Sequence, residues 1–211
     1  MSMRILLADD HGVVRRGLKD ILADEFPNAE FGEAGTTQEM LERLPECDWN
    51  MVILDITMPG RCGLEALKEI GRLHPSLPVL VVSMHSEEQY AVRALKAGAS
   101  GYVNKMRAAS DLVMAVHKIV AGGKYISVTV AEKLANHLRP GMDKPSHERL
   151  SNREYQIMRM IASGQSNKEI AAELSVSAQT VSTHRSRLLK KMGLRTKTEL
   201  VRYAIENELV D

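Results

Sequence analysis

The chain has little cysteine and no long hydrophobic run. Only two of its 211 residues are cysteines, Cys47 and Cys62, and they form neither a CxxC pair nor a cluster. This usage favours a reducing compartment and argues against a disulfide scaffold or a structural zinc site. The apolar run before Asp9 is too short for a signal peptide, and no run approaches the ~18 apolar residues that a membrane span needs. We therefore expect a cytoplasmic protein without a membrane partner.

Neither sign of charge dominates the whole chain, but its two parts differ. Residues 1–125 hold 14 Lys/Arg and 17 Asp/Glu, a net charge of −3, whereas residues 126–211 hold 14 and 10, a net charge of +4. Residues 175–198 contain six basic residues and no acidic one. This favours a polyanionic partner such as nucleic acid. A solvated helix face would have the same composition, so charge alone leaves both interpretations open.

Residues 1–125 alternate short apolar runs with amphipathic stretches, as expected of a parallel sheet with crossover helices. Several runs lack polar alternation, which is typical of strands buried on both faces. Capping-box spacing, as in Thr36/Glu39 and Ser86/Gln89, predicts helix starts between the runs. The fold class predicted is α/β, a doubly wound five-stranded parallel sheet, for which we assume the order 2-1-3-4-5. Its strands are expected at residues 3–8, 29–34, 51–54, 79–83 and 101–104.

Residues 126–147 are predicted to connect two domains. Thr129 and Glu132 have the spacing of a cap for a short helix to about Leu138. Residues 139–146 then carry two prolines and a glycine among polar residues, which indicates a linker.

Residues 148–211 are predicted to be an all-α domain of four helices. Ser151/Glu154 and Ser166/Glu169 have capping-box spacing, Ser177 is expected to cap the third helix, and Thr196/Glu199 are expected to open the fourth. Only residues 175–177 separate the second helix from the third. Such a tight connection between short helices indicates a helix-turn-helix.

Polar residues close or follow four of the five predicted strands, at the sheet edge where doubly wound sheets bind ligands. With the predicted strand order, three carboxylates converge, and like charges so close need a cation. Oxygen ligands suit Mg²⁺. Asp55 is well placed as the nucleophile that forms an aspartyl phosphate. The Ser83 hydroxyl and the Lys105 ammonium are suited to bind its phosphoryl oxygens. The three carboxylates are those of Asp9, Asp10 and Asp55.

Each of these residues also has an ordinary structural interpretation. Asp10 is a suitable helix N-cap, Asp55 a suitable turn residue, and Lys105 a suitable solvated lysine. All of them falling at strand ends by chance is much less expected. The seven histidines show no paired metal-ligand spacing, so we expect them at the surface or in the core.

Four motifs occur in order along residues 1–125: ADD at 8–10, ILDITMPG at 53–60, VVS at 81–83 and GYVNK at 101–105. In this order and spacing they resemble the response-regulator receiver domain. The resemblance implies that Asp55 accepts a phosphoryl group from a sensor histidine kinase. It implies that Asp10 and Asp55 ligate Mg²⁺, with Asp9 acting through water and the backbone carbonyl of Thr57 completing the site. It also implies that Ser83 and Lys105 bind the phosphoryl group and that Tyr102 reorients with Ser83, although plain core packing would equally suit Tyr102.

A second set of motifs covers residues 148–211: LSNRE at 150–154, NKEIA at 167–171, TVSTH at 180–184 and LLKKM at 188–192. As a block they resemble the helix-turn-helix domain of LuxR-type, NarL/FixJ-type regulators, which implies double-stranded promoter DNA as a partner. The third helix, about 178–192, is then expected to enter the major groove with Val181, Leu188 and Met192 facing inward. Base-edge contacts are expected from Ser182, Thr183 and Ser186, and phosphate contacts from Thr180, Arg185, Arg187, Lys190 and Lys191.

The fourth helix is expected to expose Val201 and Ala204 beside Tyr203. The resemblance implies a homodimer contact there on DNA, although a helix packed on its own domain would show the same pattern.

These features predict a phosphorylation-controlled transcription regulator with a receiver at 1–125, a linker with a short helix at 126–147 and a DNA-binding domain at 148–211. It is expected to dimerise when phosphorylated and to be no enzyme, apart from Mg²⁺-dependent self-phosphorylation and self-dephosphorylation. The alternative is a Mg²⁺-dependent phosphotransfer enzyme with an appended helical domain, although no phosphate-binding glycine motif is present. A constitutive DNA-binding protein whose receiver only dimerises is a third interpretation.

Overall fold

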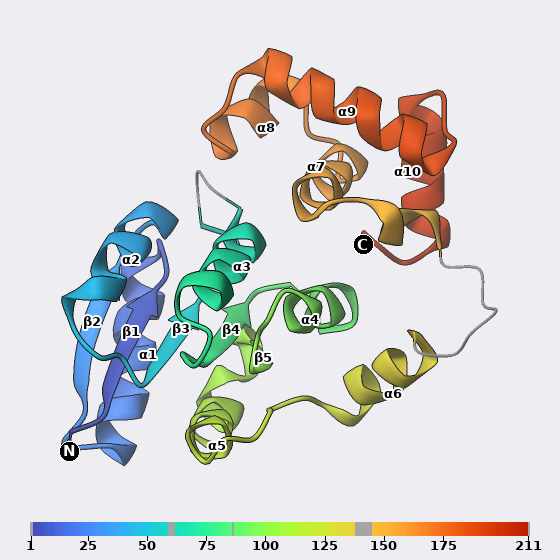
Figure 1. Cartoon of the computed structure of the whole chain (residues 1–211). Helices are drawn as coiled ribbons and strands as arrows, with labels where there is room; N and C mark the ends of the chain where they lie inside the picture. Colours follow the sequence, from blue (N-terminus) through green and yellow to red (C-terminus); the bar gives the residue numbers. More distant parts are fainter. Residues whose placement is uncertain (1, 59–61, 86, 138–144, 211) are drawn as a thin grey trace. The chain divides into compact units, whose positions relative to one another are not determined.

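The computed structural model of the chain describes residues 2–58, 62–85, 87–137 and 145–210. It divides into two compact units (Figure 1), the first spanning residues 1–136 and the second residues 137–211. Within the described residues, no helix has both the length and the apolar character needed to cross a membrane.

The first unit is built on a five-stranded parallel sheet of order β2-β1-β3-β4-β5, which confirms the predicted topology. Three strands have the predicted bounds, and the first two begin one residue later than predicted. The strands are β1 (Arg4–Ala8), β2 (Glu30–Ala34), β3 (Met51–Leu54), β4 (Val79–Ser83) and β5 (Gly101–Asn104).

Helices cover both faces of this sheet (Figure 1). On one face, α1 (Gly12–Glu25) and α5 (Ala108–Val120) pack together over side chains of β1, β3, β4 and β5. The other face carries α2 (Thr37–Arg43), α3 (Gly63–Leu73) and α4 (Glu87–Lys96). All residues of β3 and β4 are buried, because apolar side chains leave these strands on both sides. Their polar neighbours are thereby confined to the strand ends.

The loop after β3 is held close to the start of α3. A Cβ atom on Gly63 would lie 2.5 Å from the Cα of Ile56, so only glycine allows this approach. Thr36 caps α2 as predicted, since its side chain accepts a hydrogen bond from the backbone N–H of Glu39. The predicted Ser86 cap and residues 138–144 of the predicted linker lie outside the described residues.

Three further segments complete the first unit: the short helices η1 (Leu44–Glu46) and η2 (Lys105–Arg107), and α6 (Val128–His137). The predicted Thr129 cap is wrong, because Thr129 lies within α6 and Ser127 accepts the hydrogen bond from the N–H of Val130 (3.3 Å). Before α6, the chain runs beside the edge of β5. There the N–H of Tyr125 donates to the carbonyl of Ser100 (3.0 Å), and the N–H of Tyr102 donates to the carbonyl of Tyr125 (3.3 Å).

The second unit is all-α, as predicted. The capping boxes at Ser151/Glu154 and Ser166/Glu169 are both present, and Ser177 accepts the N–H of Thr180. Buried apolar side chains on all four helices form its core. Its elements are η3 (Ser146–Arg149), α7 (Asn152–Ala162), α8 (Asn167–Glu173), α9 (Ala178–Met192) and α10 (Lys197–Glu206).

Candidate functional site

Three carboxylates meet at the ends of β1 and β3. The N–H of Asp55 donates to the carbonyl of Ala8 (2.8 Å), which aligns the two strand ends. Asp9 and Asp55 are each only 2% exposed, whereas Asp10 is at the surface. We call Asp9, Asp10 and Asp55 the acidic cluster. The structure thus brings together the three aspartates that the sequence predicted to converge.

Lys105 lies between the two buried members of the acidic cluster. Its Nζ atom is 2.5 Å from Oδ2 of Asp55 and 2.6 Å from Oδ2 of Asp9, and its side chain is 5% exposed. Burial by itself would lower the pKa of this ammonium, but the attraction of Asp55 and Asp9 outweighs burial and raises the pKa above its ordinary value. Lys105 therefore stays charged at neutral pH and neutralises part of the cluster.

The remaining oxygens of the buried aspartates are bound locally. Oδ1 of Asp55 accepts hydrogen bonds from the backbone N–H of Thr57 (2.8 Å) and from the Thr57 hydroxyl. Oδ1 of Asp9 accepts the backbone N–H of His11 (2.9 Å). These bonds fix both carboxylates against their own loops, so the cluster is preformed.

The predicted Ser83 and Tyr102 lie on the neighbouring strands β4 and β5. Ser83 is fully buried, and its Oγ accepts the N–H of His85 (3.3 Å). The buried Tyr102 donates its hydroxyl proton to the carbonyl of His85 (2.8 Å), and Asn104 donates to the same carbonyl (3.0 Å). Burial raises the pKa of the Tyr102 phenol, so Tyr102 is a neutral hydrogen-bond donor. The segment after β4 is thus tied to β5 through His85, whose ring stacks on that of Tyr90 with centroids 4.4 Å apart.

The acidic cluster fits a divalent cation. The three aspartates and His11 each offer a ligand atom, and these atoms lie within 4.8 Å of one another. Oδ2 of Asp9 is buried and is paired with the Lys105 ammonium at 2.6 Å. Carboxylate oxygens are ligands for hard cations. Sequence reasoning missed His11, whose Nδ1 is 2.9 Å from Oδ1 of Asp10, although its position directly after Asp10 was a usable signal.

In the second unit, α9 presents most of the predicted contact residues at the surface. Val181, Leu188 and Met192 are buried, so the predicted inward face is confirmed. Within the outward set, Ser182 and Arg185 are half-buried. The exposed members are Thr180, Thr183, Ser186, Arg187, Lys190 and Lys191.

Lys191 has a second role that the sequence did not suggest. Its Nζ atom lies 2.6 Å from Oε2 of Glu154, the carboxylate of the α7 capping box. Burial opposes ionisation of Glu154, but hydrogen bonds from Lys191 and Ser151 prevail and lower its pKa. The C-terminal end of α9 is therefore tied to the N-terminus of α7. No local pattern signals a pair 37 residues apart.

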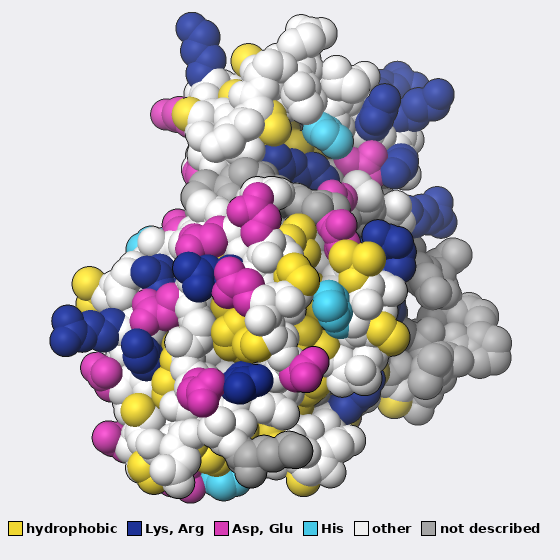
Figure 2. All heavy atoms as spheres, turned by 60° about the vertical axis from the view of Figure 1, so that its left-hand side comes forward, with side chains coloured by type: hydrophobic (Ala, Val, Ile, Leu, Met, Phe, Trp, Pro, Cys, Tyr) yellow, Lys and Arg dark blue, Asp and Glu magenta, His cyan; other side chains and the backbone are white. Residues whose placement is uncertain are grey.

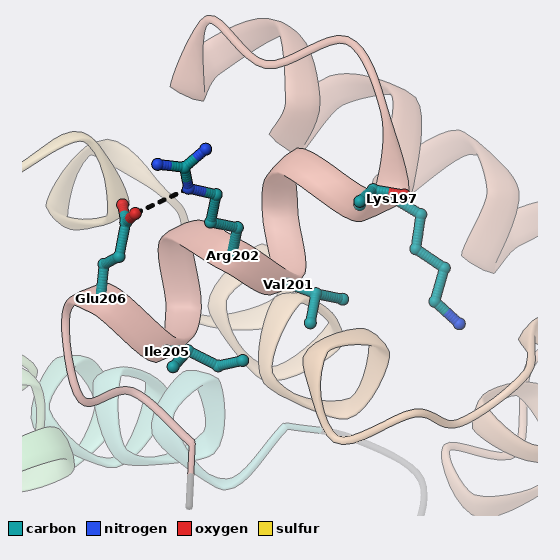
Figure 3. Close-up of a pocket in the computed structure, with 6 residues that line it drawn as sticks. Lys197, Val201, Arg202, Ile205 and Glu206 are labelled. Atoms are coloured by element: carbon teal, nitrogen blue, oxygen red, sulfur yellow. Dashed lines mark hydrogen bonds and ion pairs between the residues drawn. The ribbon is translucent and has the colours of Figure 1, made fainter.

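The predicted surface of α10 is wrong for Ala204, which is fully buried, and Ile205 is exposed in its place. The predicted Val201 is half-buried. Figure 3 shows Val201 and Ile205 on one side of α10, and a dashed line marks the ion pair between Arg202 and Glu206. In this pair, Nε of Arg202 is 2.7 Å from Oε1 of Glu206. An open hollow of about 470 Å³ lies over this helix. Tyr203 is half-buried, and its hydroxyl lies 2.9 Å from Nδ1 of His147.

Comparison with protein families and known proteins agrees with this two-unit arrangement. Residues 5–117 match the response regulator receiver domain, and residues 148–204 match the luxR family of bacterial regulatory proteins.

The chain also resembles whole proteins over nearly its full length. It is 35% identical over 210 residues to the response regulator GacA of Pseudomonas viridiflava, covering 99% of this chain and 98% of GacA. It is 34% identical over 216 residues to the oxygen regulatory protein NreC of Staphylococcus carnosus, covering 99% and 100%. The structure of RcsB from Salmonella enterica serovar Typhimurium, bound to the promoter rprA with the phosphomimetic BeF3−, matches with a TM-score of 0.66 and 27% identity, covering 96% and 98%. This chain therefore belongs to the NarL/FixJ family of two-component response regulators, in which a receiver domain is joined to a LuxR-type helix-turn-helix domain.

Proposed function

We propose that this chain regulates transcription by binding promoter DNA under the control of phosphorylation at Asp55. The observation that carries the proposal is the position of Lys105, whose ammonium lies within 2.6 Å of both buried carboxylates. A cation held there is suited to balance the charge of a phosphoryl group on Asp55. The phosphodonor is the phosphohistidine of a sensor histidine kinase.

The proposed step is transfer of a phosphoryl group to a carboxylate oxygen of Asp55. A P–O bond forms as the P–N bond of the phosphohistidine breaks, and the imidazole nitrogen keeps the electron pair. Lys105 then moves its contact from Oδ2 of Asp55 to a phosphoryl oxygen, and the Ser83 hydroxyl binds a second one. Because Ser83 and Tyr102 both contact His85, a shift of Ser83 is expected to move Tyr102.

Asp9, Asp10, Asp55 and the backbone carbonyl of Thr57 would hold Mg²⁺ beside this group. Mg²⁺ supplies positive charge that offsets the phosphoryl oxygens and the carboxylates. In the same site a water can attack phosphorus and return Asp55 to its free state, so the receiver phosphorylates and dephosphorylates itself without being an enzyme for another substrate. The presence of a DNA-binding unit argues against the alternative interpretation of the chain as a phosphotransfer enzyme.

The second unit is proposed to bind double-stranded DNA through α9. RcsB, which shares this architecture, has been solved on promoter DNA with a phosphomimetic. In this chain, Thr183 and Ser186 are exposed and suited to read base edges, with the half-buried Ser182 beside them. Thr180, Arg185, Arg187, Lys190 and Lys191 are assigned to phosphates, which position the helix without specifying sequence.

Dimerisation is proposed to link the two events. A homodimer would place two copies of α9 on two half-sites, and the exposed Ile205 with the half-buried Val201 beside it on α10 offers an apolar contact. The phosphorylated Asp55 carries about −1.5 to −2 charges where the free carboxylate carries −1, and we propose that this change favours the dimer. Because the ligand is genomic DNA, we place the protein in the bacterial cytoplasm.

The test combines phosphorylation with DNA selection. The full chain is incubated with Mg²⁺ and acetyl phosphate, its mass is measured, and it is used to select double-stranded DNA from a random pool. Asp55→Asn is compared with Asp111→Asn, which changes a buried aspartate on α5 outside the acidic cluster. We expect wild type and Asp111→Asn to gain one phosphoryl group and to bind the selected DNA more tightly. Asp55→Asn should gain none.

Three results would reject the proposal in different ways. A phosphoryl group on Asp55→Asn would mean that another residue is the acceptor. Equal DNA binding by wild type and Asp55→Asn in the presence of acetyl phosphate would favour a constitutive DNA-binding protein. Multiple turnover of a soluble phosphoester would support the phosphotransfer enzyme instead.

A further inference from the structure

Arg15 connects the acidic cluster to two other elements of the first unit. Its Nη1 atom donates a hydrogen bond of 2.6 Å to the backbone carbonyl of Asp9. Its Nε atom donates a hydrogen bond of 2.9 Å to Oε2 of Glu33 on β2. The side chain is only 21% exposed. One guanidinium, carried by the first turn of α1, therefore contacts both the end of β1 and the edge strand.

Glu33 holds this guanidinium in place from the other side. Its second oxygen, Oε1, accepts a hydrogen bond of 2.9 Å from Nζ of Lys19, one turn further along α1. The hydrogen bonds from Lys19 and Arg15 lower the pKa of Glu33, against the opposing effect of burial, so the carboxylate stays ionised at neutral pH. On the side of the first unit that carries α2 and β2, acidic and basic side chains are interleaved at the surface (Figure 2).

The carbonyl that Arg15 binds belongs to the peptide between Asp9 and Asp10. This peptide is planar, so fixing its carbonyl fixes the direction in which the chain leaves Asp9 and enters Asp10. Asp9 is also restrained by its N–H, which donates to the carbonyl of Ala34 (3.1 Å), and by its Oδ1, which accepts from His11. Asp10 has a contact of its own side chain, since its Oδ1 lies 2.9 Å from Nδ1 of His11. The contact from Arg15 extends this support to the exposed Asp10.

We propose that Arg15, held by Glu33, is a positioning residue for the metal and phosphoryl site. It touches neither the metal nor the phosphoryl group. It acts through the Asp9–Asp10 peptide, and it sets the two carboxylates in the directions that cation binding requires. The inference rests on the proposed function, because it concerns the site in which Asp55 is phosphorylated.

The competing explanation is that Arg15 and Glu33 form an ordinary surface ion pair. Such pairs contribute little to stability, and this one would leave metal binding unchanged when removed. In contrast, residues that orient metal ligands change metal affinity by about 10–100-fold when they are replaced. Metal affinity therefore separates the two explanations, whereas thermal stability alone does not.

The experiment titrates the full-length chain with Mn²⁺ and follows the free ion by electron paramagnetic resonance. Arg15→Ala is compared with Arg16→Ala, the exposed neighbouring arginine on the same helix. Asp10→Asn shows that the signal reports the acidic cluster. We expect Arg15→Ala to weaken Mn²⁺ binding by about tenfold or more, Arg15→Lys to recover part of the loss, and Arg16→Ala to match wild type.

Glu33→Gln gives an independent measurement that keeps Arg15 in the chain. We expect a smaller loss of Mn²⁺ affinity in the same direction, because the guanidinium loses its ionic anchor but keeps the Asp9 carbonyl. If Arg15→Ala is unfolded at the assay temperature, as judged by circular dichroism, Arg15→Lys and Glu33→Gln decide.

Mn²⁺ affinities of the Arg15 and Glu33 variants within twofold of that of Arg16→Ala would overturn the inference. The same samples are treated with acetyl phosphate and weighed by mass spectrometry. A wild-type chain that gains no phosphoryl group would reject the proposed function instead, so the two failures are distinguishable.

Discussion

Removing the Lys105 ammonium should destabilise the first unit strongly in the absence of metal. Lys105→Ala leaves the buried carboxylates of Asp9 and Asp55, each 2% exposed, without the cation that lies 2.6 and 2.5 Å from their oxygens. Breaking a buried ion pair by removing one partner costs about 3–5 kcal/mol. For a unit of this size, a loss of 3 kcal/mol lowers Tm by roughly 10 °C.

The measurement is urea unfolding followed by circular dichroism, in EDTA and in Mg²⁺. Lys68→Ala, on the exposed side of α3, is the control and should stay within about 0.5 kcal/mol of wild type. In Lys105→Ala/Asp55→Asn, one of the two uncompensated charges is gone, so this double variant should be more stable than Lys105→Ala. Mg²⁺ should also restore part of the lost stability, since it replaces the missing positive charge.

The pH dependence of this contribution has a definite sign. The pKa of Lys105 is raised in the folded protein, so its contribution is fully present below the ordinary lysine pKa of about 10.4 and disappears as the pH rises through the higher folded value. The difference between wild type and Lys105→Ala should therefore be constant from pH 7 to about pH 10 and then shrink. A difference below 1 kcal/mol at pH 7 in EDTA would refute the reasoning.

Three other predictions concern the fold and the DNA-binding unit. Glu154→Gln should destabilise the second unit by about 1–3 kcal/mol at pH 7. Because the pKa of Glu154 is lowered in the folded protein, the difference in unfolding free energy between wild type and the variant should vanish as the pH falls through that pKa. A difference that persists at pH 2 in urea unfolding would contradict this. Lys190→Ala should lower the slope of the logarithm of the DNA-binding constant against the logarithm of the salt concentration by about 1 in gel-shift titrations. Lys191→Ala should also destabilise the fold, because Glu154 loses its ion-pair partner. Equal Tm values for the two variants would contradict the contact between α7 and α9. Gly63→Ala should lower the free energy of unfolding by about 1–3 kcal/mol, because its Cβ would lie 2.5 Å from the Ile56 backbone. Gly71→Ala, whose Cβ would meet nothing within 4 Å, should leave the stability unchanged or raise it slightly, as measured by thermal melts of both variants.

The sequence was sufficient for the sheet and for the convergence of the aspartates. Buried apolar runs fix where parallel strands lie, and the residues that follow a run must leave the sheet at its carboxyl end. Asp9 and Asp55 are therefore placed together once the strand order is known. The same logic of a periodic apolar face placed Val181 and Leu188 inside the second unit.

Contacts that long side chains make between elements distant in the sequence could not be predicted. Lys191 meets Glu154 and Arg15 meets Glu33 only because separate helices and strands are packed side by side, and the sequence pattern of each element is the same with or without the contact. The cap of α6 was misplaced by two residues, because Ser127 and Thr129 are both hydroxyl residues and Ser127 accepts the hydrogen bond. The prediction of the exposed face of α10 was wrong at Ala204, because a small rotation of the helix buries Ala204 and exposes Ile205 instead.

The hydrogen bonds between Tyr125 and the outer rim of β5 have a consequence for the behaviour of the sheet in solution. An unprotected outer strand is a template on which another chain can add a strand, and such growth leads to aggregation. Here the backbone N–H of Tyr102 and the carbonyl of Ser100 are already occupied by Tyr125, which shields that border. The opposite border, β2, carries the charged Glu30 and Glu33. Backbone pairing protects one margin of the sheet and charged side chains protect the other, and both features oppose association of receivers through their strands.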